Sequence, residues 1–180
     1  MKIKDKVVLI TGANRGIGRA LVLEALRRGA STVYAGMRAP VAFADKRVIS
    51  LALDITDPAQ VSDAALTIGS LDVLINNAGV AYYDDLSDSA MLDKHLAVNL
   101  YGPHRVTQAF LPLLKKSHGA IVNNLSMVAL APFMPIASYS VSKAAAFSMT
   151  QSLRAFLAGD GVSVHAVMTG PIDTDMNRGL

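Results

Sequence analysis

The chain has no cysteine among its 180 residues. A disulfide framework and a thiolate metal site are therefore both excluded. The four histidines, His95, His104, His118 and His165, do not have the spacing of metal ligands, so no metal site is expected. Charge is also scarce, because Asp, Glu, Lys and Arg together make up only 17% of the residues. Hydrophobic residues make up 52%, which allows a large core and argues against disorder.

The few basic residues are scattered along the chain. The net charge is +3, and the adjacent basic pairs include Arg27 with Arg28 and Lys115 with Lys116. Both pairs are expected at helix ends, where cations interact favourably with the helix dipole. A nucleic-acid interface needs a basic face with aromatic side chains, and the sequence shows none. We therefore expect no nucleic-acid partner.

One uncharged run, residues 119–142, is long enough to raise the question of a membrane span. It contains Asn123, Asn124, Pro132 and Pro135, which favour a buried strand followed by a loop and a helix start. The N-terminus runs directly into a charged strand start at residues 2–6, so no signal peptide is expected. These patterns favour a cytoplasmic protein without a membrane partner.

Short apolar segments alternate with helical patterns along the whole chain. This alternation predicts an α/β fold, in which a doubly wound parallel sheet of the Rossmann type forms the middle of three layers. A single domain is expected over residues 1–180. A long helical region at residues 89–117 should be interrupted by Pro103 and Pro112. The expected strands are residues 7–10, 32–38, 48–54, 71–75, 120–125 and 162–168.

A glycine-rich turn follows the first expected strand and opens a helix. Glycines let the backbone turn tightly and approach a ligand, and the helix N-terminus offers N–H groups to a pyrophosphate. Strand, glycine turn and helix in this order are typical of dinucleotide binding. The predicted cofactor-binding residues of this turn are Gly12, Asn14, Arg15, Gly16, Ile17 and Gly18.

The second expected strand ends at Met37 and Arg38. In dinucleotide-binding folds this strand end meets the adenosine ribose, where an acidic residue binds the 2′-hydroxyl. Arg38, with Arg15 in the glycine turn, suits a 2′-phosphate instead, so NADP(H) is favoured and NAD(H) stays possible. Arg38 could also be an exposed strand end, and Asp45 is an alternative ribose ligand.

Tyr139 and Lys143 are four residues apart in an expected helix at residues 138–158, so they share one face. A lysine ammonium beside a phenol lowers the phenol pKa, which makes Tyr139 a candidate general acid or base. The spacing alone also fits an ordinary surface pair. The other candidates, Arg38, Asp54, Ser126 and Gly170, fall with the glycine turn at the carboxyl ends of strands, where open α/β sheets bind ligands.

Four motifs in order resemble the short-chain dehydrogenase/reductase family, in its simple oxidoreductase branch. The glycine turn resembles its cofactor turn, residues 76–79 its strand-four motif, and Tyr139 with Lys143 its active-site pair. Ser126 lies thirteen residues ahead of Tyr139, as in the family, and Asn99 stands in the matching helix segment. The resemblance runs from the first expected strand to the last residue.

The resemblance implies a role for each matching residue. Tyr139 would exchange a proton with the substrate oxygen, Ser126 would donate a hydrogen bond to that oxygen, and Lys143 would lower the Tyr139 pKa and hold the nicotinamide ribose. Asn99 would hold a water that links Lys143 to solvent. Further cofactor contacts are implied for Asp54, Ile55, Asn76, Ala78, Gly79, Gly170, Ile172 and Thr174.

The main departure from the family lies at the end, because members usually continue past the position of Leu180 with a substrate-covering lid and a seventh strand. Thr169 also stands where a proline is usual, which should loosen that turn slightly. The expected activity is hydride transfer between nicotinamide and a small carbonyl or secondary alcohol. A non-catalytic dinucleotide sensor or scaffold is the alternative. Apolar residues on several faces of the helix after Tyr139 predict a homodimer or homotetramer.

Overall fold

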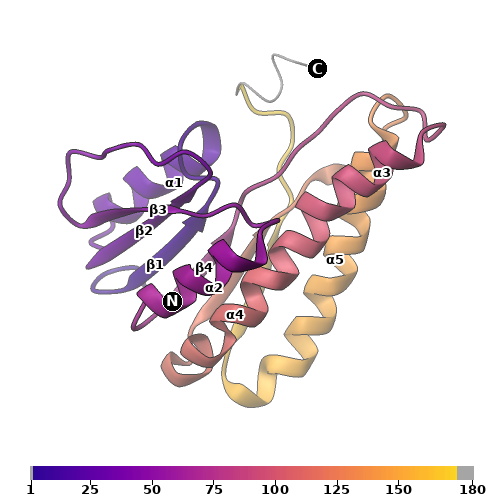
Figure 1. Cartoon of the computed structure of the whole chain (residues 1–180). Coiled ribbons are helices and arrows are strands. Elements are labelled where there is room, and N and C mark those ends of the chain that lie inside the picture. The colour runs from indigo at the N-terminus through magenta and orange to yellow at the C-terminus, as the bar shows by residue number, and fades with distance from the viewer. Residues whose placement is uncertain (1, 174–180) are drawn as a thin grey trace.

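The computed structural model describes residues 2–173, which form one parallel sheet with helices on both faces (Figure 1). The strand order is β3-β2-β1-β4-β5-β6, and every neighbouring pair is parallel. The doubly wound fold class is confirmed. The strands are β1 (Val7–Thr11), β2 (Thr32–Met37), β3 (Val48–Ala52), β4 (Val73–Asn76), β5 (Ala120–Asn124) and β6 (Ser163–Val167).

Two clusters of buried apolar side chains lie on opposite faces of the sheet. On one face α1 (Gly16–Arg27) packs Val22 against Val8 and Ile10. The other face is covered by α2 (Pro58–Thr67), α4 (Gly102–Ser117) and α5 (Ala137–Leu157). Leu9 and Phe110 are fully buried in this second cluster. The alternation of Val8, Leu9 and Ile10 between the two clusters is the period-two pattern of a strand covered on both faces.

The helical region before β5 is continuous, so the expected interruptions at Pro103 and Pro112 do not occur. It consists of α3 (Ser89–Leu96), a π-helical turn η1 (Ala97–Tyr101) and α4. In the π turn the Gly102 N–H bonds back to the Ala97 carbonyl, and Pro103 follows in the first turn of α4. A proline there costs little, because the π turn just before it already departs from the α-helical hydrogen-bond pattern and proline has no N–H to donate. Pro112 is exposed inside α4 and leaves the helix intact.

Two short 3₁₀ turns complete the helical elements. One, η2 (Met127–Ala129), follows β5, and the other, η3 (Ala158–Asp160), extends α5 to Gly161 in the left-handed conformation. The turn η2 and the loop after it lead from the end of β5 to the first turn of α5. Within residues 2–173, no helix is both long and apolar enough to cross a membrane.

Candidate active site

The carboxyl ends of the strands open into one cavity of about 740 Å³. The glycine turn, the end of β2, the residues after β4 and β5, and the first turns of α5 all border it. The parallel sheet thus brings together residues that are far apart in the sequence. Of the predicted site residues, those that border this cavity are Gly12, Asn14, Arg15, Gly16, Ile17, Gly18, Arg38, Asp54, Ile55, Ala78, Gly79, Ser126, Tyr139, Lys143, Gly170 and Ile172.

The glycine turn is packed too closely for side chains. Gly12 has φ +67°, and a Cβ there would lie 2.8 Å from the Ala78 Cα. A Cβ on Gly18 would lie 2.1 Å from the Gly12 carbonyl oxygen. The turn therefore presents bare backbone at the start of α1, which is a cradle for a pyrophosphate group. This geometry fits a dinucleotide cofactor.

The segment after β4 braces this turn. The Thr11 hydroxyl accepts hydrogen bonds from the backbone N–H groups of Asn77 and Ala78, both at 3.0 Å. The Asn77 amide donates to the carbonyls of Thr11 and Gly12, at 3.0 and 3.3 Å. Asn77, which the sequence analysis did not select, borders the cavity. The predicted cofactor residue Asn76 does not border it.

Asn76 points instead into the core, because neighbouring residues at a strand end face opposite sides. Its amide donates to Asn123 at 2.9 Å and to Thr107 at 3.2 Å. It is 4% exposed, so its side chain ties β4 to β5 and α4 and cannot reach a bound cofactor.

The adenosine end of the cavity carries charges of both signs. Arg15 and Arg38 are exposed on its rim, and Asp54 lies nearby. Burial alone would raise the pKa of Asp54, but hydrogen bonds from Thr56 and the charge of Arg38 hold that pKa below its usual value. Asp45 does not border the cavity. Its carboxylate pairs with Arg47 at 2.7 Å, so it is not placed as a ribose ligand.

Ser126, Tyr139 and Lys143 meet in the middle of the cavity. Lys143 Nζ lies 5.6 Å from the centroid of the Tyr139 ring and donates to the Asn124 carbonyl at 3.0 Å. The Ser126 hydroxyl is close enough to the Tyr139 phenol to influence its pKa, and it accepts a hydrogen bond from the Val128 N–H at 3.4 Å. Ser126 lies two residues after the end of β5, whereas the other two lie on the first turns of α5, so the η2 loop sets their separation.

The pKa of Tyr139 is raised above its usual value of 10.0, opposite to the expected direction. Burial is the main cause, and the Ser126 hydroxyl opposes it only in part. Burial also lowers the pKa of Lys143 from 10.5 to about 8. Loss of solvation therefore sets the direction of both pKa shifts.

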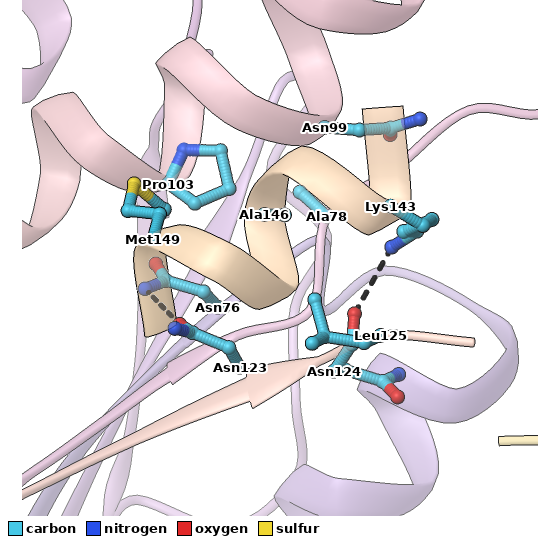
Figure 2. A pocket seen from close by; sticks show the side chains of 10 residues that line it. All are labelled: Asn76, Ala78, Asn99, Pro103, Asn123, Asn124, Leu125, Lys143, Ala146 and Met149. Atoms are coloured by element: carbon cyan, nitrogen blue, oxygen red, sulfur yellow. Dashed lines mark hydrogen bonds between the residues drawn. The ribbon is translucent and has the colours of Figure 1, made fainter. Parts of the chain in front are cut away.

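Asn99, at 2% exposed, lies in the π turn behind Lys143. Its side chain exchanges two hydrogen bonds with the backbone of Val80, at 3.0 and 2.9 Å, and donates to the Ser142 hydroxyl at 3.0 Å. A small cavity of about 10 Å³ lies between Asn99, Lys143 and Asn76 (Figure 2). That volume corresponds to about one water position.

A second layer supports Tyr139 from behind and was not foreseen from the sequence. His95 is fully buried one helical turn before Asn99. It accepts a hydrogen bond from the Tyr82 N–H at 3.1 Å. Asp84 lies two residues after Tyr82. Its carboxylate accepts hydrogen bonds from the backbone N–H and from the hydroxyl of Ser138, at the start of α5. The only signal in the sequence is the spacing of four between His95 and Asn99.

The segment after β6 closes the nicotinamide end, where Gly170 and Ile172 border the cavity. The Thr169 hydroxyl donates to the Leu125 carbonyl at 2.9 Å, and the Thr169 carbonyl accepts from the Met127 N–H at 3.0 Å. This threonine therefore ties the turn to the end of β5, contrary to the expected loosening. The predicted contact Thr174 lies outside the described residues.

The chain is similar to known proteins in sequence and in structure. The family model described as short chain dehydrogenase matches residues 6–180. An uncharacterised oxidoreductase of Staphylococcus epidermidis is 34% identical, over 99% of this chain and 83% of its own length. Estradiol 17-beta-dehydrogenase 2 of Rattus norvegicus is also 34% identical, over 98% of this chain and half of its own length.

Two solved structures resemble the chain over nearly its whole length. A short chain dehydrogenase from Burkholderia cenocepacia J2315, in complex with NADP, has a TM-score of 0.96 and 40% identity, covering 100% of this chain and 78% of its own. A 3-ketoacyl-(acyl-carrier-protein) reductase from Brucella melitensis, complexed with NADH, has a TM-score of 0.92 and 26% identity, covering 99% and 81%. With a family match that begins at residue 6 and runs to the last residue, the chain belongs to the short-chain dehydrogenase/reductase family and is an NAD(P)-dependent oxidoreductase.

Proposed function

We propose that this oxidoreductase interconverts a small carbonyl compound and its secondary alcohol with NADP(H), and that Tyr139 is the general acid and base. The observation that carries the proposal is the meeting of Ser126, Tyr139 and Lys143 in the cavity that the glycine turn also borders. The nicotinamide cofactor, when bound, supplies or accepts the hydride.

In the direction of reduction, the Tyr139 hydroxyl donates its proton to the substrate oxygen. A neutral phenol is the required form, and the raised pKa of Tyr139 keeps it protonated at neutral pH. Ser126 donates a hydrogen bond to the same oxygen and stabilises the charge that develops on it. Both side chains border the same cavity, which supports their action on one substrate oxygen.

Lys143 stabilises the phenolate that Tyr139 becomes after it has given up its proton. Its ammonium lies close to the phenol ring, and burial strengthens the attraction between opposite charges. The small cavity beside Asn99 gives Lys143 room for a water on the side away from the substrate. Asn99 thus supports a proton path that restores the Tyr139 proton from solvent.

Arg15 and Arg38 support a preference for NADP(H) over NAD(H). Both guanidinium groups lie on the rim at the adenosine end, where the 2′-phosphate of NADP(H) would be bound. The similar structure from Burkholderia cenocepacia contains NADP, whereas that from Brucella melitensis contains NADH, so the family uses both. The charges on this chain's own rim therefore carry the preference.

We also propose that the chain assembles through α5. Val141 is 43% exposed and Phe156 is 81% exposed in the single chain, whereas buried positions of α5 include Ser138, Ser142 and Thr150. We expected a helix with apolar residues on several faces to be buried on all sides. In a single copy of the chain, part of the apolar surface of α5 remains exposed. Pairing of α5 with α5 of a second copy would cover this face, as in a homodimer or homotetramer.

Replacing Tyr139 with Phe tests the proposed chemistry. We expect turnover of carbonyl substrates to fall by at least about 100-fold, since the proton donor is lost. The fluorescence titration with NADPH should change little, because the hydroxyl is not needed to hold the pyrophosphate. Wild-type turnover in Tyr139→Phe would refute the assignment. The alternative, a non-catalytic dinucleotide sensor or scaffold, would be favoured if the wild type bound NADPH but failed to oxidise it with any of a panel of carbonyl compounds.

A further inference from the structure

The charged and uncharged side chains that border the large cavity are separated along its length. Arg15, Arg38 and Asp54 all lie at the adenosine end. Beyond Tyr139, the cavity is bordered by two loops, residues 79–81 and residues 126–136, and by the segment after β6. The side chains that these segments place against the cavity are uncharged. The apolar ones of the two loops are Val80, Ala81, Met127, Val128, Phe133 and Ile136, and Pro171 and Ile172 lie after β6, where the nicotinamide is expected.

These apolar residues are next to the reacting groups in the chain as well as in space. Met127 and Val128 follow Ser126 directly, and Ile136 lies one residue before the first turn of α5 that carries Tyr139. A substrate whose oxygen contacts Ser126 and Tyr139 therefore has its carbon substituents against hydrocarbon side chains. Phe133 is 58% exposed and Met127 is 53% exposed, so both have surface left to bury against a ligand.

The two loops are held in place by backbone contacts that also remove the nearest acidic side chain from the cavity. Asp84 forms a parallel bridge with Ile136, and its N–H donates to the Pro135 carbonyl at 3.1 Å. Its carboxylate accepts from Ser138 at the N-terminus of α5 and does not border the cavity. The only ionisable side chains at this end of the cavity are Tyr139 and Lys143, within the part of the chain that the structure describes.

We propose that the substrate is an uncharged carbonyl compound with an apolar alkyl or aryl group beside the reacting carbon, or the corresponding alcohol. This inference rests on the proposed carbonyl chemistry at Tyr139 and adds the substrate class. A carboxylate or phosphate on that side would lose its hydration, and no basic side chain there would bind it except Lys143, which already stabilises Tyr139. A polyol would leave its hydroxyl groups facing hydrocarbon.

A matched pair of methyl ketones tests the inference on the full chain. Benzylacetone and levulinate share the same four-carbon ketone, and they differ only in a phenyl group against a carboxylate at its end. We expect kcat/KM with NADPH to favour benzylacetone by at least about 100-fold, because the site offers contact to the ring and none to the anion. Calorimetry on the NADPH-loaded protein should show the same order of affinity, whether or not either ketone is turned over.

Charge placed in the wall should weaken this preference, and the adjacent residue provides the control. Phe133→Arg should lower kcat/KM for benzylacetone and raise it for levulinate, which shifts their ratio at least about tenfold. Met134→Arg adds the same charge in the same loop, but Met134 is 86% exposed and does not border the cavity, so the ratio should stay as in the wild type. Equal shifts in both variants would show a general charge effect and overturn the inference.

The outcomes separate the two proposals. Reduction of levulinate at a rate equal to or above that of benzylacetone would leave the carbonyl chemistry standing and overturn the apolar substrate class. Turnover of neither ketone would count against the carbonyl chemistry, while the calorimetric order still decides the substrate class. Absence of benzylacetone binding, or tighter binding of levulinate, would overturn the apolar substrate class.

Discussion

The imidazole of His95 meets the phenol of Tyr139 edge to face, with ring centroids 6.2 Å apart and an angle of 63° between the planes. Both ring nitrogens of His95 are engaged, one with the Met91 carbonyl at 2.9 Å and the other as acceptor from the Tyr82 N–H. This pattern fits a neutral imidazole that is fixed in rotation. His95 contacts the Tyr139 ring and does not border the cavity, so we expect it to help orient the phenol.

Replacing His95 with Phe keeps an aromatic ring behind Tyr139 but removes both hydrogen bonds. We expect kcat to fall by about tenfold while the KM for the cofactor stays unchanged, because the phenol is less well oriented. The loss of an acceptor for the partly buried Tyr82 N–H should also lower the free energy of unfolding by about 1 kcal/mol. Steady-state kinetics and urea unfolding measure the two effects.

The kinetic pattern distinguishes positioning from simple loss of stability. The exposed His104→Ala on α4 is the control, since it changes a histidine that contacts neither Tyr82 nor Tyr139. A His95→Phe variant that loses stability but keeps the wild-type kcat at a temperature where it is folded would exclude the positioning role.

Reversing the charge of Arg38 tests the cofactor preference. Arg38→Asp should weaken NADPH binding by at least about tenfold and leave NADH binding nearly unchanged, because only NADPH carries the 2′-phosphate. Fluorescence titrations with both cofactors give the two dissociation constants. Lys46→Asp makes the same change in net charge at an exposed position that does not border the cavity. Equal losses for both cofactors in Arg38→Asp would mean that Arg38 does not read the phosphate.

The buried Lys143 makes the stability of the cofactor-free chain depend on alkaline pH. Its pKa falls from 10.5 in the unfolded chain to about 8 in the folded chain, so both states are protonated below pH 8 and the folded chain bears the full cost of a buried ammonium. Between these values the unfolded chain binds more protons, so stability rises with pH. From pH 8 to pH 10 the gain should be about 2 kcal/mol.

Tyr139 has the opposite effect above pH 10, because its pKa is raised on folding and the unfolded chain loses the phenol proton first. Urea unfolding should therefore be measured between pH 8 and pH 10, as the difference between the wild type and Lys143→Met. The methionine keeps the buried chain length but has no proton to titrate. Parallel pH profiles of the two proteins would contradict the buried, titrating lysine.

The apolar surface of α5 predicts self-association. In sedimentation velocity the wild type should be a dimer or tetramer, and Phe156→Asp should shift it to monomer, because a charge would be buried in the interface. Leu66→Asp on α2 is the matched control, since Leu66 is 84% exposed and Phe156 81%. A wild type that sediments as a monomer, or a Leu66→Asp variant that dissociates equally, would refute the α5 interface.

Local patterns in the sequence predicted most of the architecture. Short runs such as residues 7–10 have the composition of buried parallel strands, and the glycine turn has one main physical use, so neither depends on distant contacts. The parallel order then places the strand ends at one edge of the sheet, which is why widely separated candidates border one cavity. The expected breaks at Pro103 and Pro112 failed because a π turn absorbed one proline and an exposed helix face tolerated the other.

The spacing of residues along the sequence could not predict which way a side chain points or how deeply it is buried. Asn76 and Asn77 are adjacent and identical in type, yet the strand pleat sends one into the core and the other to the cavity. The sequence placed Lys143 beside Tyr139 and suggested a lowered phenol pKa. How deeply the two groups are buried decides the sign, and burial is a property of the whole fold.

The sequence by itself determined the parallel fold, the dinucleotide turn and the family, because each follows from residue types at short spacing. Only the tertiary structure brought the residues behind Tyr139 into place and formed the uncharged wall of the cavity beyond it. His95, Asp84 and Phe133 come from separate segments, and nothing in their spacing relates them to the reacting groups. They acquire that relation when β4, β5 and α5 pack side by side, since folding alone sets distances between residues far apart in the chain.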